Sequence, residues 1–324
     1  MSATATMLEK VNRYIEYRRK LGTKLWIASF LLRSFGRYCD QCAHGQPLTV
    51  ELALQWATKP KTDKRHYHAK RLDAIRPFAR YLSVFEPQTQ IPPTRLLGPS
   101  FVRTTPHIYT RKETLALMRA ARTIKATTGA PTINSLRNVT ILGLLACTGM
   151  RIGEILALKN EDVDLVQAVL IVRHSKNLPM RLVPVKDSTV CRLRKYRDAR
   201  DRRFDLSGPE DAFIRSSWNG PLTYRSFEAV FKTIRERAGL VGESATRRNV
   251  RLHDFRHTFA CNYLVRAYRE KRNIDDAVHE LSVYLGHAHL QCTYWYLTGI
   301  PALLKQCTQR FEAEARRQRK GGGQ

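Results

Sequence analysis

The sequence predicts a mainly α-helical protein with one small β-sheet, built as an N-terminal helical domain followed by an α+β domain. Apolar residues recur at three- and four-residue steps through most of the chain, which is the period of an amphipathic helix. One stretch near the middle instead has β-branched runs on both sides of a polar turn. A proline-rich segment interrupts the helical pattern after residue 86, and a length of 324 residues suits two domains.

Residues 1–86 are expected to form a helical bundle. Segments with apolar residues at helical spacing cover residues 7–19, 25–38, 49–57 and 62–85. The last of them is rich in Lys and Arg, and its run from Lys61 to Arg71 places Tyr67 among basic side chains. A solvated helix face accounts for this run, but so does a surface that contacts phosphates.

Residues 87–107 are predicted to be an interdomain linker. The segment contains five prolines, at positions 87, 92, 93, 99 and 106. Proline has no amide proton and a fixed φ, so neither a helix nor a central strand can persist there. The second domain is therefore expected to cover residues 108–324.

The second domain should begin with a helix and contain one hairpin. Thr110 and Glu113 match a capping box, and helices are predicted over residues 110–123, 135–146 and 151–158 and again from Leu222 onward. Between them, the β-rich runs 169–172 and 182–185 predict the strands of a β-hairpin. Lys176 falls at or near the tip of this hairpin.

The charge predicts a polyanionic partner. The chain has 56 Lys and Arg against 28 Asp and Glu, a formal charge of +28. Both parts are basic, because residues 1–98 carry 17 basic and 7 acidic side chains, net +10, and the remainder carries +18. Two basic folded parts favour a surface that follows a phosphate backbone over a single basic tether.

Neither a membrane nor a metal is expected as a partner. No stretch approaches the roughly 20 apolar residues of a membrane span, and the charged N-terminus does not resemble a signal peptide, so we expect a cytoplasmic protein. Its seven cysteines do not suggest a disulfide framework. Cys39 and Cys42 with His44 have the spacing of metal ligands, but no second pair lies nearby, and we predict no metal and no cofactor.

Five short motifs of the second domain contain side chains suited to phosphate chemistry. Each also has an ordinary structural explanation. In the order of the residues named next, these are a helix ion pair with Glu154, a solvated lysine, a polar helix face, a helix-capping histidine and a buried aromatic residue. The residues are Arg151 in TGMRIGE, Lys176 on the hairpin, His253 and Arg256 in LHDFRHTFA, His287 in LGHAHL and Tyr296 in TYWYLTG. His257, beside Arg256, is expected to be structural.

Arg, Lys, His-x-x-Arg, His and Tyr in this order and spacing resemble the tyrosine recombinase family, which includes phage integrases. The resemblance covers about Thr110 to Ile300, and the helical module before it resembles the family's core-binding domain. The family's nucleophile follows LGH by nine residues, which selects Tyr296. One departure is the segment HAHLQCTYWY, where the family more often has small polar residues and two threonines, of which Thr293 remains.

The resemblance implies a site-specific recombinase that cuts and rejoins DNA through a 3′-phosphotyrosine. Tyr296 would be the nucleophile, and Arg151 and Arg256 would hold the phosphate. Lys176 would protonate the leaving 5′ oxygen, His253 would exchange the tyrosine proton, and His287 would hydrogen-bond the phosphate.

The partner implied by the resemblance is double-stranded DNA with specific recombination sites, bound by a homo-tetramer that serves a mobile element. The apolar residues Leu297, Ile300, Leu303 and Leu304 after the nucleophile could dock on a neighbouring subunit or pack on their own domain. Two alternatives are a type IB topoisomerase-like strand transferase and a DNA-binding protein without catalysis.

Overall fold

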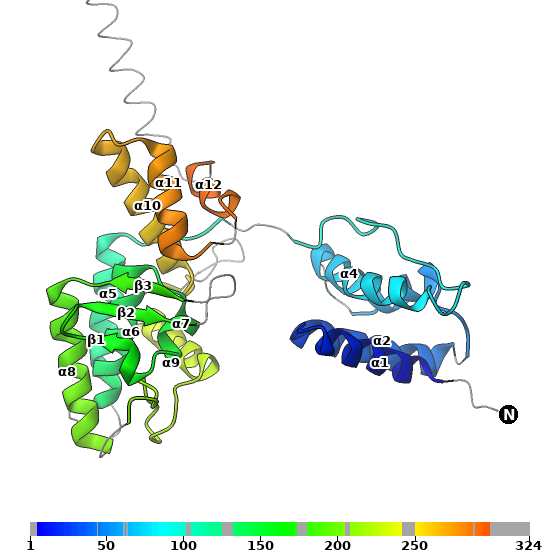
Figure 1. Cartoon of the computed structure of the whole chain (residues 1–324), viewed down its shortest axis with the longest axis horizontal. Coiled ribbons are helices and arrows are strands. Elements are labelled where there is room, and N and C mark those ends of the chain that lie inside the picture. The colour runs from blue at the N-terminus through cyan, green and yellow to red at the C-terminus, as the bar shows by residue number, and fades with distance from the viewer. Residues whose placement is uncertain are drawn as a thin grey trace, which may run out of the picture. The chain divides into compact units, whose positions relative to one another are not determined.

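The computed structural model describes residues 5–43, 45–60, 62, 64–101, 105–124, 132–173, 180–204, 208–241, 250–287 and 289–298. It separates into two compact units, Met1–Thr104 and Thr105–Gln324 (Figure 1). The described part is mainly helical with one three-stranded sheet, which confirms the predicted fold class. None of its helices has the length and apolar character that crossing a membrane requires.

The first unit is a four-helix bundle in the described residues. Its helices are α1 (Met7–Lys20), α2 (Trp26–Cys42), α3 (Val50–Thr58) and α4 (Arg65–Leu82), so the four predicted helices are confirmed. Their apolar faces meet in one core that buries Val11, Phe35, Trp56 and Phe78. The bundle therefore forms because each helix has a single apolar stripe that only its neighbours can cover.

One residue of the basic run on α4 belongs to this core. Arg71 is only 8% exposed, donates from Nη2 to the carbonyl oxygen of Trp56 at 2.8 Å and lies 3.6 Å above the Trp56 ring centroid. The guanidinium of Arg71 therefore bonds and packs against Trp56 inside the bundle. Any phosphate contact by this run has to come from its other residues.

The proline-rich segment lies against the first unit over residues 87–101. The backbone N–H of Gln90 donates to the carbonyl oxygen of Leu48 at 2.8 Å. Arg76 of α4 donates to the carbonyl oxygens of Pro92 and Pro93 at 2.9 and 2.8 Å. These bonds give the segment hydrogen-bond partners in the first unit in place of those of a helix or a sheet, which its prolines do not allow. The extent of the linker between the two domains stays a prediction.

The second unit contains eight α-helices among its described residues. They are α5 (Arg111–Thr123), α6 (Ile133–Thr148), α7 (Ile152–Leu156), α8 (Asp187–Phe204), α9 (Tyr224–Arg237), α10 (Asp254–Arg269), α11 (Ile274–Leu285) and α12 (Gln291–Thr298), with a 3₁₀ turn at Asn160–Asp162. The predicted capping box is confirmed, because Thr110 and Glu113 bond each other's backbone amides at the start of α5. Helix α8 was not predicted.

The sheet has the strand order β1 (Val163–Asp164), β2 (Val169–Val172) and β3 (Arg181–Pro184), all antiparallel. The predicted hairpin is confirmed, with Val172 paired to Arg181 and Val169 to Pro184. Lys176, predicted at its tip, lies outside the described residues. Strand β1 was not predicted because two residues are too few to show a period.

Two apolar clusters support the second unit. The larger one joins α5, α6, α8 and α9 with the inner face of the sheet. The smaller one joins α10, α11 and α12, which Figure 1 shows together at one end of the unit. Helix α6 is buried on several faces and also contacts α10, so its C-terminal end lies where the two clusters meet.

Candidate active site

The first predicted site residue, Arg151, is presented by a tight turn between α6 and α7. Gly149 ends α6 with φ of +61°, and a Cβ atom there would lie 2.6 Å from the ring of Phe259. Only glycine fits both the left-handed backbone and the close approach. Helix α7 then starts directly after Arg151, whose guanidinium donates to Glu154 Oε1 at 2.8 Å and to the carbonyl oxygen of Gly286 at 3.4 Å.

Glu154 is the carboxylate that pairs with the arginines at this end of the second unit, which we call the corner: the α6–α7 turn with the ends of α10, α11 and α12 next to it. The ordinary ion pair with Arg151 that the sequence allowed is present, but the same carboxylate also accepts two bonds from Arg181, at 3.1 and 2.6 Å. Burial alone would raise the pKa of Glu154. The bonds from Arg181 and Arg151 outweigh it and lower the pKa to about 2, so the carboxylate is ionised at neutral pH.

Arg256 is the most deeply buried arginine of the candidate site. It is 1% exposed on α10 and donates to the carbonyl oxygens of Gly149 at 3.1 Å and Leu285 at 2.6 Å, which joins the ends of α6 and α11. Burial and the neighbouring Arg151 lower its pKa to about 10, and it stays charged at neutral pH. Two adjacent guanidinium groups repel each other, and a bound anion would relieve that repulsion.

Two histidines at the start of α10 lie beside these cations. His253 precedes the helix, and its pKa is lowered by desolvation and then by Arg256 and Arg151. Its ring centroid is 4.8 Å from that of His257, at an interplanar angle of 90°. The pKa of His257 is lowered to about 4, chiefly by burial. Both imidazoles are therefore favoured in the neutral form.

His287 follows Gly286, which ends α11 with φ of +66°. Its Nδ1 atom lies 2.7 Å from the hydroxyl of Thr293, a fully buried residue of α12. Desolvation, then the cations of Arg256 and Arg151, lower the pKa of His287 to about 3. A neutral ring whose Nδ1 is occupied by a hydroxyl leaves Nε2 for a ligand.

Tyr296 lies on α12 with its ring near the rings of two histidines. The ring centroids are 5.5 Å from His257 and 6.3 Å from His287, and the side chain is 3% exposed. Tyr294 is 40% exposed, and its hydroxyl donates to Asp275 at 2.9 Å instead. Of these two tyrosines, only Tyr296 has ring contacts with histidines of the candidate site.

The structure thus brings five of the six predicted residues together, from the α6–α7 turn, α10, the end of α11 and α12. They are Arg151, His253, Arg256, His287 and Tyr296. Lys176 lies outside the described residues. Among the residues described, no group of three His, Cys, Asp or Glu side chains could hold a metal ion.

Sequence reasoning placed three residues outside the candidate site that the structure shows next to it: Glu154, His257 and Thr293. Glu154 and Thr293 bond directly to Arg151 and His287, and His257 contacts the ring of Tyr296. The spacing of Arg151 and Glu154 was a usable signal for the first, since residues three apart on a helix are neighbours. No periodic signal connects Thr293 to His287, because the turn between α11 and α12 lies between them.

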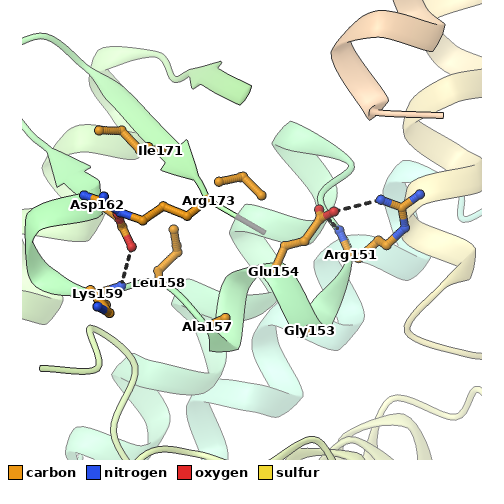
Figure 2. Close-up of a pocket in the computed structure, with 10 residues that line it drawn as sticks. Arg151, Gly153, Glu154, Ala157, Leu158, Lys159, Asp162, Ile171 and Arg173 are labelled. Carbon is orange, nitrogen blue, oxygen red and sulfur yellow. Dashed lines mark hydrogen bonds and ion pairs between the residues drawn. The ribbon is translucent and has the colours of Figure 1, made fainter. Parts of the chain in front are cut away.

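A cavity of about 370 Å³ lies beside the site, between α7 and strand β2. Figure 2 shows Arg151 and Glu154 with their charged ends turned toward each other on one side and Asp162 and Arg173 on the other. The wall between them is largely apolar, with Gly153, Ala157, Leu158, Ile171 and Val172. Arg151 therefore borders an open space with its guanidinium partly accessible.

Most of the second unit matches a known family. The model of the phage integrase family matches residues 108–299, which include every predicted site residue. The chain is 35% identical over 309 residues to y4rB of Sinorhizobium fredii, a protein named as an integrase/recombinase, covering 95% of this chain and 98% of that protein. It is 28% identical over 237 residues to the tyrosine recombinase XerC of Chlamydia trachomatis, covering 73% of this chain and 68% of XerC.

Solved structures share the fold. The site-specific recombinase XerH, in a post-cleavage complex with a palindromic difH substrate, has a TM-score of 0.67 at 17% identity, covering 95% of this chain and 86% of that one. A λ integrase dimer bound to a core site has a TM-score of 0.63 at 17% identity, covering 88% and 96%.

Fold and sequence therefore define an enzyme of DNA strand breakage and rejoining. The chain belongs to the phage integrase family of tyrosine recombinases, which act in site-specific recombination.

Proposed function

We propose that this chain cuts and rejoins specific DNA sites through a 3′-phosphotyrosine at Tyr296. The observation that carries the proposal is the convergence of two arginines, three histidines and one tyrosine on one corner of the second unit. The phenolic oxygen attacks the scissile phosphorus, forms a new P–O bond and releases the 5′ oxygen. A 5′ hydroxyl then attacks the same phosphorus and releases the tyrosine, so bond energy is conserved without a nucleotide.

Arg151 and Arg256 neutralise the non-bridging oxygens of the phosphate. Charge accumulates on those oxygens in the pentavalent transition state, and cations fixed beforehand need no reorganisation to meet it. The buried Arg256 is held by two carbonyl oxygens, and Arg151 by Glu154. Neutral His287 donates a hydrogen bond from Nε2 to the phosphate when the hydroxyl of Thr293 donates to its Nδ1.

The protons move through groups on both sides of the phosphorus. Lys176 gives a proton to the departing 5′ oxygen and takes the proton of the attacking 5′ hydroxyl in the second step. His253, whose lowered pKa favours the neutral form, accepts the proton of Tyr296 and returns it in the second step. Every proton and every phosphate bond is thus exchanged between side chains and the DNA, so we propose activity without a metal ion or other cofactor.

Tyr296 has to become accessible for this reaction. A phenol that is 3% exposed and packed against two imidazole rings cannot contact a phosphodiester. We therefore include in the proposal a movement of α12, or of the side chains that cover it, when DNA binds. Burial of the nucleophile would prevent cleavage of DNA before the site is assembled.

The remaining assignments are proposals of the same kind. The partner is double-stranded DNA carrying recombination sites, bound by a tetramer, with residues 1–86 as the core-binding domain, residues 87–107 as the linker and residues 108–324 as the catalytic domain. The charge of +28 supports a phosphate-rich partner. The proposed setting is a mobile element acting in the cytoplasm.

The proposal is tested by trapping the covalent intermediate. The full-length chain is incubated with DNA that flanks its gene, carrying a nick close to each candidate site so that the released fragment is lost and religation fails. We expect adducts that survive SDS, with Tyr296 found attached to a 3′ phosphate by mass spectrometry of the digested adduct.

Two substitutions assign the nucleophile. Tyr296→Phe should form no adduct and Tyr294→Phe should form it normally, because Phe keeps the ring and removes only the attacking oxygen. An adduct that persists in Tyr296→Phe and disappears in Tyr294→Phe would mean that the nucleophile is Tyr294.

A further inference from the structure

We propose that Arg181 is a positioning residue for Arg151 and acts through the carboxylate of Glu154. The inference rests on the proposed role of Arg151 at the phosphate. Arg181 is the first residue of β3 and is 9% exposed. Its Nη1 and Nη2 atoms donate to Oε1 and Oε2 of Glu154 at 3.1 and 2.6 Å.

The same two oxygens hold Arg151. Oε1 of Glu154 accepts from Nη1 of Arg151 at 2.8 Å, and Oε2 accepts from the backbone amide of Arg151 at 2.9 Å. Each carboxylate oxygen is thus shared between Arg181 and Arg151. Two parallel bonds from one guanidinium fix both the plane and the rotation of a carboxylate. Arg181 thereby determines where Glu154 holds Arg151.

The exposures of the two arginines separate their roles. The side chain of Arg181 is 7% exposed, and both of its terminal nitrogens are bonded to Glu154. The side chain of Arg151 is 32% exposed, and within the described part of the chain its Nη2 has only a long contact of 3.4 Å to the carbonyl oxygen of Gly286. Arg151 can therefore turn a donor to a ligand, whereas Arg181 would first have to leave its carboxylate.

The charges give a reason for a second arginine. A lone buried carboxylate beside Arg151 would neutralise the cation that the phosphate needs. With Arg181 added, the three charges sum to +1, and Glu154 stays ionised because its pKa is lowered to about 2. Glu154 can thus fix the position of Arg151 while the cluster as a whole still attracts an anion.

The test measures single-turnover cleavage by the full-length chain at saturating DNA. Arg181→Gln should cleave up to about 100-fold more slowly, the effect of a displacement of about 1 Å at a catalytic group, with the Kd for DNA unchanged. Arg181→Lys should recover part of the rate, because it restores the charge but not the paired bonds. Arg181→Gln combined with Glu154→Gln should be no slower than the slower single variant, since both break the same connection.

A neutral substrate tests whether the effect passes through Arg151. When a methyl group replaces one non-bridging oxygen of the scissile phosphate, the charge that Arg151 meets is removed. The rate ratio of wild type to Arg181→Gln should then shrink toward one, as it should for Arg151→Ala. A ratio that stays the same would overturn the inference. Selective rescue of Arg181→Gln by a substrate with sulfur in place of the bridging 5′ oxygen would also overturn it, because the substitution would then affect protonation of the leaving group.

Arg200 supplies the matched control for loss of a buried guanidinium. It is 2% exposed on α8 and donates to Asn160 and to the carbonyl oxygen of Phe213 at 2.7 and 2.9 Å. Arg200→Gln should lower Tm but leave the cleavage rate of the folded protein unchanged. Equal rates for Arg181→Gln and wild type would reject the positioning role alone, whereas a wild type that forms no adduct would reject the proposed function itself.

Discussion

The Nδ1 atom of His287 lies 2.7 Å from the hydroxyl oxygen of Thr293. The two residues come from different sides of the turn that joins α11 to α12, and Tyr296 follows Thr293 by less than one helical turn. Their bond therefore fixes the imidazole against the helix that carries the proposed nucleophile. When the Thr293 hydroxyl donates to Nδ1, the neutral ring carries its proton on Nε2, the nitrogen that we propose bonds the phosphate.

We expect Thr293→Val to slow cleavage about 10-fold, the effect of removing one hydrogen bond from a buried polar group. Valine keeps the shape of threonine, so packing in the fully buried position should change little. The measurement is single-turnover cleavage at saturating DNA. Thr293→Ser keeps the hydroxyl and should stay within a small factor of wild type; if it were as slow as the valine variant, packing and not the hydrogen bond would be responsible.

His287 should remain neutral down to about pH 4, because its pKa in the folded chain is lowered to about 3. In the unfolded chain its pKa is about 6.5, so the unfolded state binds the proton first as pH falls. Stability from this group is thus complete above pH 6.5 and is lost progressively between pH 6.5 and 3. The imidazole carbon resonances of labelled protein report the folded pKa.

The same histidine should contribute to the pH dependence of unfolding. Below pH 6.5 it lowers the free energy of unfolding by at most about 1.4 kcal/mol per pH unit. His287→Gln should flatten the profile from pH 6.5 to 5, as measured by denaturant unfolding. His66→Gln on α4, a histidine exposed in the first unit, is the control and should leave the slope as it is. A resonance of His287 that titrates near pH 6.5 would contradict the expected burial.

Arg151→Ala should reduce cleavage about 100- to 1000-fold, because it removes a cation positioned for the transition state. DNA affinity should change little, since one of 56 basic side chains contributes a small part of the phosphate contacts. Adduct formation and filter binding at one salt concentration give the two quantities. Arg266→Ala on α10, 66% exposed at its side chain, is a control for loss of a single charge. Parallel loss of binding and cleavage in Arg151→Ala would contradict this division.

Lys176 should act as a proton donor and not only as a charge. If so, Lys176→Arg should fail as Lys176→Ala does, because the pKa of arginine is too high for it to release a proton. A substrate with sulfur at the bridging 5′ position has a leaving group that departs without protonation. It should restore cleavage by Lys176→Ala and not by Arg151→Ala. Without such selective rescue, Lys176 would be a solvated hairpin residue.

Much of the fold could be predicted because its signals are local. The four helices of the first unit and the capping box at Thr110 follow from the spacing of apolar residues and from two side chains three residues apart. Helix α8 was missed, although its buried residues Val190, Leu193, Tyr196 and Arg200 recur at helical steps. Its many charged residues hide that stripe when only apolar residues are counted, since Arg200 is one of the four.

The sequence by itself determined the family and the order of the predicted site residues, and it led to the prediction that Tyr296 is the nucleophile, because motif order and spacing are properties of the chain. Only the tertiary structure decided which other side chains contact these residues. Arg181 is 27 residues from Glu154, and His257 is 39 residues from Tyr296, yet both pairs are in contact. Hydrogen bonds, desolvation and Coulomb forces depend on distance in space, and these distances exist only after α7, α10 and α12 have packed against one another.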